Sequence, residues 1–155
     1  AKDIVAIDIA EEKLAMARQA GATHTLLSGA SDADLPRCQL VIEAAGHPSS
    51  INQAVQLTKA GGHVVFIGIP TGEVPISTAT FSHFLRQEIS LHGAWNSFSA
   101  PFPGDEWTAS IDKLASGELQ WKFMITHDLP LDELPSMFQR YADRSEVAAK
   151  VIFRP

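Results

Sequence analysis

A short apolar run that ends on an acid and passes directly into a helical pattern constrains this chain more than any other stretch. The run is Ile4–Ile7, the acid is Asp8, and the helical pattern begins with Glu11, Glu12 and Lys13. A buried parallel strand has this Val/Ile-rich character, and an amphipathic helix after it makes half of a βαβ unit. The stretch therefore predicts an α/β fold with a parallel sheet.

Asp8 is the first candidate ligand-binding residue. The carboxyl ends of parallel strands line the crevice in which α/β sheets bind their ligands. In dinucleotide-binding sheets a carboxylate at this position accepts hydrogen bonds from the adenosine ribose, and it repels a 2′-phosphate, so Asp8 favours NAD over NADP. The alternative is a strand-end acid that only caps the next helix, and these residues alone leave both interpretations open.

Bulk composition narrows the class of protein. The 155 residues suffice for one domain with a real core. The net charge of −6, without a run of basic residues, disfavours nucleic-acid and anionic-membrane partners. The single cysteine, Cys38, excludes an internal disulfide and a cysteine-based zinc site. No membrane-spanning stretch or signal peptide is evident, so we expect a cytoplasmic protein, and the start without Met suggests a piece of a longer chain.

Strand and helix patterns alternate along the rest of the chain. Further strands are predicted at Thr23–Leu27, Gln39–Ala45, His63–Ile67, Ile89–Ala94 and Val147–Phe153, with a short edge strand at Val74–Ser77 and an extended piece at Phe123–His127. Helices are predicted at Ala10–Ala20, Ile51–Lys59, from Thr78, from Asp105 and at Leu131–Tyr141. The alternation predicts a mostly parallel sheet covered by helices on both faces.

Helix ends are predicted from their flanking residues. Ser49 or Ser50 is expected to cap the second helix and Thr78 the third, because short hydroxyl side chains satisfy the first free amides of a helix. Gly61-Gly62 is expected to end the second helix, and Gly21 the first.

Small residues follow three more of the predicted strands. They form the segments Glu43-Ala44-Ala45-Gly46, Ile67-Gly68-Ile69-Pro70 and Gly93-Ala94-Trp95-Asn96. Small residues there let a flat cofactor lie close to the backbone, and Gly68 removes a side chain where a nicotinamide ring could approach. Close helix–sheet packing explains Gly46 equally well, and a strand ending in a turn explains Gly68. Together with Asp8, these successive strand ends predict one shared crevice.

The catalytic motifs that a sequence can reveal are missing. The six histidines form no H-x-x-x-H or H-x-H pair, no serine lies in a G-x-S-x-G elbow, and no Walker loop is present. No catalytic or metal-binding residue is therefore assigned from motifs.

Taken in order, five segments resemble the medium-chain zinc-dependent alcohol and polyol dehydrogenases, most closely the sorbitol and galactitol-1-phosphate dehydrogenase branch. Residues 5–22, with V-A-I-D and E-x-K-L-A-x-A-R-x-x-G-A, resemble the family's second strand and its helix. Residues 41–46 and 61–68 are similar to the fourth and fifth strands, 97–107 to the loop after the sixth, and 146–153 to the closing segment. The resemblance covers essentially the whole chain.

The resemblance implies a Rossmann-like, doubly wound, mostly parallel sheet that lacks its first strand, so that residues 1–155 are a partial NAD-binding domain. The family's G-x-G-x-x-G turn and its GroES-like catalytic domain, which carries every zinc ligand, have no counterpart here. Zinc is thus expected only through that absent domain. The implied activity of the full-length enzyme is hydride transfer between NAD and a sugar alcohol or its phosphate, and the chain alone is expected to be inactive.

The resemblance also implies roles for individual residues. Asp8 would hold the adenosine ribose with support from Lys13, and Lys150, a looser match, would approach the pyrophosphate. The residues expected beneath the cofactor are Glu43, Ala44, Ala45 and Gly46. Those expected at the nicotinamide are Ile67, Gly68 and Ile69, and those near the ring and the substrate are Ala94, Trp95 and Asn96.

Two expectations concern partners. The family's first strand lies centrally, so without it the strands at Ile4–Ile7 and Gln39–Ala44 must pair directly, be bridged by another chain, or flank an upstream segment. A homo-oligomer is expected through Val74–Ser77, because the family pairs an edge strand there across a two-fold axis.

Two other functions stay open at this point. One is a zinc-free quinone or enoyl reductase, which Asp8 disfavours because such enzymes usually prefer NADP. The other is a non-catalytic Rossmann-like module that binds an adenine nucleotide or a protein.

Overall fold

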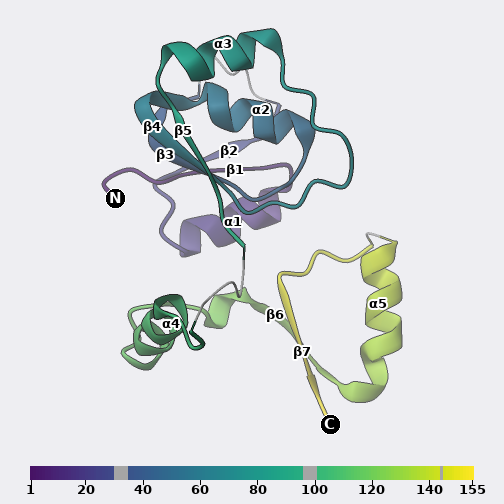
Figure 1. The fold of residues 1–155 in the computed structure, drawn as a ribbon. Helices are drawn as coiled ribbons and strands as arrows, with labels where there is room; N and C mark the ends of the chain where they lie inside the picture. The colour runs from purple at the N-terminus through teal and green to yellow at the C-terminus, as the bar shows by residue number, and fades with distance from the viewer. Residues whose placement is uncertain (30–34, 96–100, 144) are drawn as a thin grey trace. The chain divides into compact units, whose positions relative to one another are not determined.

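The fold is built from parallel strands joined by helices, as the sequence predicts. The structure, a computed structural model, describes residues 1–29, 35–95, 101–143 and 145–155. The chain divides into two compact units, one made of Ala1–Gly29 with Ser99–Pro155 and the other of Ala30–Phe98. In the described residues every strand pair is parallel, and the strands, labelled in Figure 1, form three sheets of order β1-β2, β3-β4-β5 and β6-β7. This confirms the α/β, Rossmann-like class.

The N-terminal strand–helix–strand has the predicted form. β1 (Val5–Asp8) pairs with β2 (His24–Leu27), with Asp8 opposite Leu27. Between them α1 (Glu11–Gln19) buries Leu14, which is 1% exposed. Gly21 follows the helix with a φ of +102°, a left-handed conformation that glycine adopts without strain, and so ends the helix as expected.

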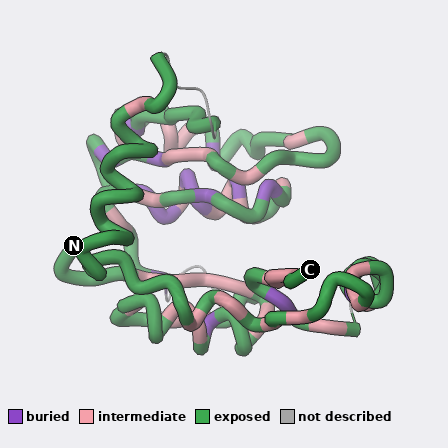
Figure 2. Tube along the Cα trace, turned by 90° about the horizontal axis from the view of Figure 1, so that it is seen from below, coloured by how far each residue is buried: buried purple, intermediate pink, exposed green. Residues whose placement is uncertain are grey.

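The Ala30–Phe98 unit packs two helices on one face of a three-stranded sheet. The strands are β3 (Cys38–Glu43), β4 (Thr58–Phe66) and β5 (Ser90–Gly93), and the helices are α2 (Pro48–Gln56) and α3 (Thr78–Arg86). The core consists of Ala54, Val55, Val64 and Ile89, with Val41, Phe66 and Phe84 packed around it. The buried stretches that this packing produces are purple in Figure 2.

The opposite face of this sheet is uncovered within the same unit. Side chains alternate between the two faces of a strand, so Leu40 and Ile42 of β3 point away from Val41 and Glu43. They are 55% and 59% exposed. Within the described residues of this unit α2 and α3 both pack against the Val41 side, and helices on the other face stay a prediction. β1 and β3 belong to different sheets and to different units, so how the gap between these two strands is filled stays a prediction.

Two helix caps lie one to three residues before the predicted positions. The N-cap of α2 is His47, whose ring accepts a hydrogen bond from the Ser49 amide. The N-cap of α3 is Ser77, whose hydroxyl accepts from the Thr80 amide at 3.0 Å. In both cases an acceptor side chain stands immediately before the helix, where its extended backbone aims it at the free amides.

The prediction that Gly61-Gly62 ends α2 is wrong. The helix ends at Gln56, and β4 begins at Thr58 and runs through both glycines. The pairing shifts here, because Cys38 opposes Thr58 while Leu40 opposes His63. This irregularity explains the glycines: a Cβ on Gly62 would lie 2.8 Å from the Gln39 carbonyl oxygen, and Gly61 has a φ of +64°.

The C-terminal part contains α4 (Asp105–Ala115), a 3₁₀ turn (Lys122–Met124), β6 (Ile125–Pro130), a second 3₁₀ turn (Leu131–Glu133), α5 (Leu134–Ala142) and β7 (Lys150–Arg154). Pro135 lies in the first turn of α5, as predicted. No residue of α4 is buried.

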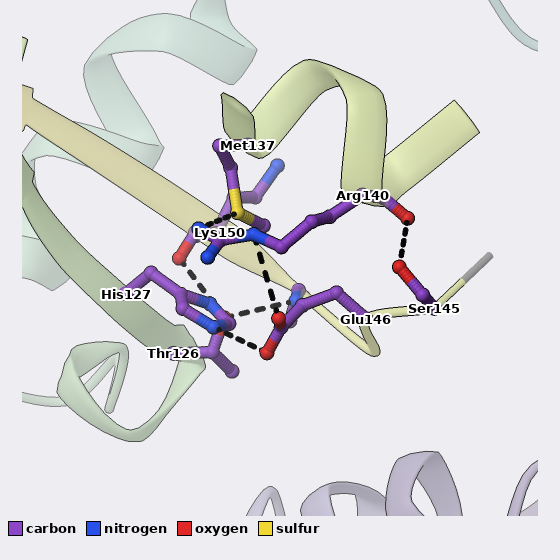
Figure 3. A network of polar contacts seen from close by, with 8 residues as sticks. Thr126, His127, Met137, Arg140, Ser145, Glu146 and Lys150 are labelled. Atoms are coloured by element: carbon purple, nitrogen blue, oxygen red, sulfur yellow. Dashed lines mark hydrogen bonds and ion pairs between the residues drawn. The ribbon is translucent and has the colours of Figure 1, made fainter. Parts of the chain in front are cut away.

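A polar network ties the connection between β6 and β7 together (Figure 3). The His127 ring lies between the Thr126 hydroxyl, at 2.9 Å, and the Glu146 carboxylate, at 3.0 Å. Glu146 also lies 3.7 Å from Arg140 of α5. The Thr126 hydroxyl donates to the Lys150 carbonyl. The network therefore fixes the start of β7 against β6 and α5.

The other end of the β6–β7 pair is held by a two-point ion pair. Arg154 donates from Nε and Nη2 to the two carboxylate oxygens of Asp128, at 2.6 Å and 2.5 Å. These hydrogen bonds, together with the guanidinium charge, lower the pKa of Asp128 and raise the pKa of Arg154.

Arg154→Gln should return the pKa of Asp128 toward its ordinary value, measured by NMR titration of the carboxyl carbon. Because the folded pKa lies below the unfolded one, the pair stabilises the fold above about pH 4, and this contribution disappears as the pH falls through the folded pKa. The melting temperature of the variant should therefore change less with pH in this acid range than that of the wild type. Lys150→Gln, at the other end of β7, should leave the Asp128 titration unchanged, and an equal effect of both variants would contradict the pairing.

Candidate functional site

The ends of β3, β4 and β5 lie at the same edge of one sheet. Glu43 is in register with Phe66, and Phe66 with Gly93. The Ala94 amide donates to the Phe66 carbonyl at 3.0 Å, which continues the alignment one residue further. The segments that follow, 44–46, 67–69 and 94–95, therefore leave the sheet side by side. Asn96, the remaining predicted member, lies outside the described residues.

Glu43 is the buried centre of this edge. The residue is only 3% exposed. Its Oε1 accepts hydrogen bonds from the Ala45 and Gly46 amides, both at 3.0 Å, and from the Ser50 hydroxyl at 2.7 Å. Oε2 accepts a second bond from the Gly46 amide at 3.2 Å. A carboxylate buried this deeply is tolerated because these donors replace its lost hydration.

The main chain of Glu43 holds the neighbouring strand end. Its carbonyl accepts from the amides of Ile67 and Gly68, at 2.9 Å and 3.1 Å. A Cβ on Gly68 would lie 2.3 Å from the Gly46 nitrogen and 2.6 Å from Glu43 Oε2. The missing side chain of Gly68 thus faces protein, and its small size serves the packing of two loops.

Gly46 completes the same contact from the other side. It has a φ of +68°, and a Cβ there would lie 2.5 Å from the Ile69 carbonyl oxygen. Close packing between the two loops therefore explains both glycines, rather than the helix–sheet packing that the sequence left open for Gly46.

The other predicted residues of this edge face outward. Ile67, Ile69 and Trp95 are 49%, 62% and 65% exposed. Ala44, Ala45 and Ala94 are exposed too. A Cβ on Gly93 would meet nothing within 4 Å. The edge thus combines a rigid buried junction with small and apolar groups that a ligand can reach.

A groove of about 220 Å³ opens beside this junction. It lies between α2, α3 and the ends of β4 and β5, and its walls include Phe66, Gly68, Ile76 and Leu91. The lining is almost entirely apolar, which suits hydrocarbon or aromatic groups rather than phosphate.

The segment that contains Val74–Ser77 forms no strand within this chain, contrary to the edge-strand prediction. It is held instead by one side chain of α2. The Asn52 amide group donates to the Pro75 carbonyl at 2.9 Å and its oxygen accepts from the Ser77 amide at 3.2 Å. The two backbone groups that Asn52 bonds belong to residues two apart in the chain, so this side chain ties the segment to α2 at two points.

The remaining predicted residues belong to the other unit. Asp8 ends β1 and is half-buried, and its Oδ1 accepts from the Ala10 amide at 3.0 Å. Ala10, the N-cap of α1, has no side-chain cap of its own, so Asp8 also serves the helix entry. Lys13 and Lys150 are exposed. Since these residues and the 43–46, 67–69 and 94–95 segments lie in separate units, the shared crevice stays a prediction.

Sequence reasoning missed two residues that organise the edge. Ser50 was expected only as a possible helix cap, yet it donates to Glu43, and Asn52 was not singled out. The one available signal was the Ser-Ser-Ile-Asn start of a helix directly after a strand ending in an acid.

Metal-binding and membrane-spanning features are absent from the described ranges. Within residues 1–29, 35–95, 101–143 and 145–155, no three His, Cys, Asp or Glu side chains lie together as metal ligands, so no zinc ligand is assigned to this part of the chain. Among the helices of these same ranges, none is long and apolar enough to cross a bilayer.

Comparison with known proteins identifies relatives over the full length of the chain. The family model described as "Zinc-binding dehydrogenase" matches residues 1–116. Galactitol 1-phosphate 5-dehydrogenase of Escherichia coli (strain K12) is 30% identical over 163 residues, covering 100% of this chain and 47% of the relative. The chain therefore spans about half the length of this curated relative.

Solved structures agree with the sequence matches. The crystal structure of galactitol-1-phosphate dehydrogenase from Escherichia coli superposes with a TM-score of 0.88 at 28% identity, covering all of this chain and 47% of the other. A zinc-binding dehydrogenase from Sinorhizobium meliloti 1021, bound to NADP, has a TM-score of 0.78 at 28% identity. The match covers 100% of this chain and 46% of that protein. A dehydrogenase from E. coli CFT073 in complex with NADH shares the fold at 19% identity, with a TM-score of 0.80. The match covers 99% of this chain and 45% of that protein.

Gly68→Ala should destabilise the protein by about 1–3 kcal/mol or more, because the new Cβ overlaps the Gly46 backbone and the Glu43 carboxylate. Gly93→Ala is the matched control at the next strand end. The added Cβ has no atom within 4 Å there, so this variant should leave the free energy of unfolding unchanged or raise it by up to about 1 kcal/mol. Thermal and urea unfolding measure both, and equal effects would contradict the packing described for Gly68.

Proposed function

Because this chain belongs to the zinc-binding dehydrogenase family, we propose that it is the cofactor-binding part of an oxidoreductase that transfers hydride between NAD and a polyol or polyol phosphate. The observation that carries the proposal is the alignment of three parallel strand ends around Glu43. Crevices outside the carboxyl ends of parallel strands are where α/β sheets take up dinucleotides.

The residues at this edge fit one half of a nicotinamide dinucleotide. The exposed small and apolar residues Ala44, Ala45, Ile67, Ile69 and Ala94 offer contacts without charge. When bound, the nicotinamide ring accepts or gives the hydride. The role proposed for this chain is to bind and orient that ring, whereas activation of the alcohol by zinc falls to ligands outside the described residues.

The choice of NAD rests on Asp8. One of its carboxylate oxygens is bonded to the Ala10 amide, and no bond of the other is found within the described residues. That oxygen is suited to accept from a ribose hydroxyl, and the negative charge opposes a 2′-phosphate. The relatives include proteins bound to NADH and to NADP, so the argument for NAD depends on this side chain.

The choice of a polyol phosphate rests on similarity to galactitol 1-phosphate 5-dehydrogenase. The full-length protein should oxidise polyols or polyol phosphates with NAD, followed by the absorbance of NADH at 340 nm. A panel of sugar alcohols, their phosphates, simple alcohols, quinones and enoyl thioesters, each with NAD(H) and NADP(H), separates the possibilities. Activity only on quinones or enoyl compounds, or none together with no dinucleotide binding, would overturn the proposal.

Variants of Asp8 in the same assay test the cofactor choice. Asp8→Ala should lower kcat/KM for NAD by about tenfold or more, because a charged hydrogen bond to the ribose is lost. Asp8→Asn keeps a hydrogen-bonding group but removes the charge, so it should mainly raise kcat/KM for NADP. If both variants left the ratio of the two cofactors unchanged, Asp8 would be only a helix cap.

We also propose that two copies pair through residues 74–77. Asn52 bonds the Pro75 carbonyl and the Ser77 amide and so ties this segment to α2 from one side. The outward groups of Ile76 are thereby presented as a strand edge, and Pro75, which lacks an amide hydrogen, has only its carbonyl engaged on the inner side. An exposed strand edge of this kind is a template for a second chain.

Ile76→Pro removes the outward amide hydrogen and should shift the full-length protein toward smaller species in sedimentation velocity at micromolar concentration. Pro75→Ala, one residue earlier, leaves the outer edge intact and should retain the wild-type assembly. A wild-type monomer, or an assembly insensitive to Ile76→Pro, would contradict this pairing.

A further inference from the structure

The two loops at the strand edge are joined by a single residue. The side chain of Glu43 bonds the amides of Ala45 and Gly46, and its carbonyl bonds the amides of Ile67 and Gly68. No other residue in the described ranges bonds both loops in this way. The position of each loop is therefore set relative to the other through Glu43.

The partners of the Glu43 carboxylate are all hydrogen-bond donors. Two are main-chain amides and one is the Ser50 hydroxyl in the first turn of α2. The two amides can only donate, so they require an acceptor at this position, and an ionised carboxylate offers acceptors alone. The Ser50 hydroxyl also lies 2.8 Å from the His47 carbonyl oxygen. A glutamine at this position would turn one amino group toward donors, although its shape is nearly the same.

The side chain of Glu43 is too buried for a ligand to contact it. It is 3% exposed and its oxygens are occupied by the protein, whereas the neighbouring Ala44 and Ala45 are exposed. The sequence-based expectation placed Glu43 beneath the cofactor in the same role as Ala44 and Ala45. The geometry separates these roles.

We propose that Glu43 is a positioning residue, which acts on the nicotinamide cofactor by fixing the backbone of residues 44–46 and 67–69. The proposal rests on the proposed function for the identity of the ligand. It goes beyond that function by dividing the strand edge into residues that touch the cofactor and one that holds them in place. The affinity for the cofactor then depends on the carboxylate without any contact to it.

The test uses the full-length protein with Glu43→Gln, and Glu43→Asp in case the first variant folds poorly. Asp shortens the side chain by one methylene, so its carboxylate reaches the loop amides less well. Val64→Ala is the control, since Val64 is a fully buried core residue of β4 with no polar contact to either loop. It should lower the melting temperature through lost packing alone.

Glu43→Gln and Glu43→Asp should each raise the Kd for NADH, measured by fluorescence titration, by at least about tenfold, the loss expected for charge-assisted hydrogen bonds that order a binding loop. KM for the alcohol at saturating cofactor should change by less than about twofold. Val64→Ala should leave the Kd unchanged despite its lower melting temperature. If the Glu43 variants bound NADH as tightly as the wild type, or weakened it no more than Val64→Ala does, the proposal would be overturned.

Amide hydrogen exchange without cofactor tests the hold on the loops directly. Exchange at Ala45 and Gly46 should accelerate at least about tenfold in Glu43→Gln and remain near wild type in Val64→Ala under native conditions. Unchanged exchange in Glu43→Gln would overturn the proposal even if the dinucleotide binds. Failure of the wild-type protein to bind NADH would refute the proposed function instead, which keeps the two failures apart.

Discussion

The arrangement of the strand edge depends on how one buried carboxylate is satisfied. Glu43 ends β3 in an environment from which water is excluded, and leaving its charge unpaired there would be costly. The chain meets this requirement with donors from the loop that follows and from the first turn of α2. The start of α2 and the loop are consequently assembled around the Glu43 side chain, and the end of β4 around its main-chain carbonyl. The glycines at 46 and 68 permit the close approach that this assembly demands.

The order of strands and helices could be predicted because it follows from hydrophobic periodicity. Runs such as Val64-Val65-Phe66 favour a buried strand, and Ile51, Ala54 and Val55 lie at positions i, i+3 and i+4 on the buried face of α2. Helix ends were less predictable. Gly61-Gly62 signals a helix stop as readily as a strand irregularity, and only the pairing with β3 decides which occurs. The caps were displaced because His47 and Ser77 already supply acceptors before the predicted serine and threonine positions.

The candidate site was predictable in its residues but not in their roles. Small residues after successive strands could be read from the sequence, and so could the acid at Asp8. The direction in which a Cβ would point at a glycine could not be read from the sequence. In the structure the Cβ position of Gly68 faces Gly46 rather than a ligand. The sequence also does not reveal that the Glu43 carboxylate accepts hydrogen bonds from its own loop, because an acid at a strand end is equally compatible with an exposed ligand contact.

The Asp128 and Glu43 carboxylates differ in what surrounds them. Asp128 faces the guanidinium of Arg154 at the surface, an attraction between full charges that dissolved ions screen. Glu43 is instead held by amide and hydroxyl dipoles in a buried setting, where mobile ions have little access. Rising ionic strength should therefore loosen the β6–β7 pair while the edge formed by β3 and β4 retains its shape, so that tolerance of saline conditions differs between two parts of one chain.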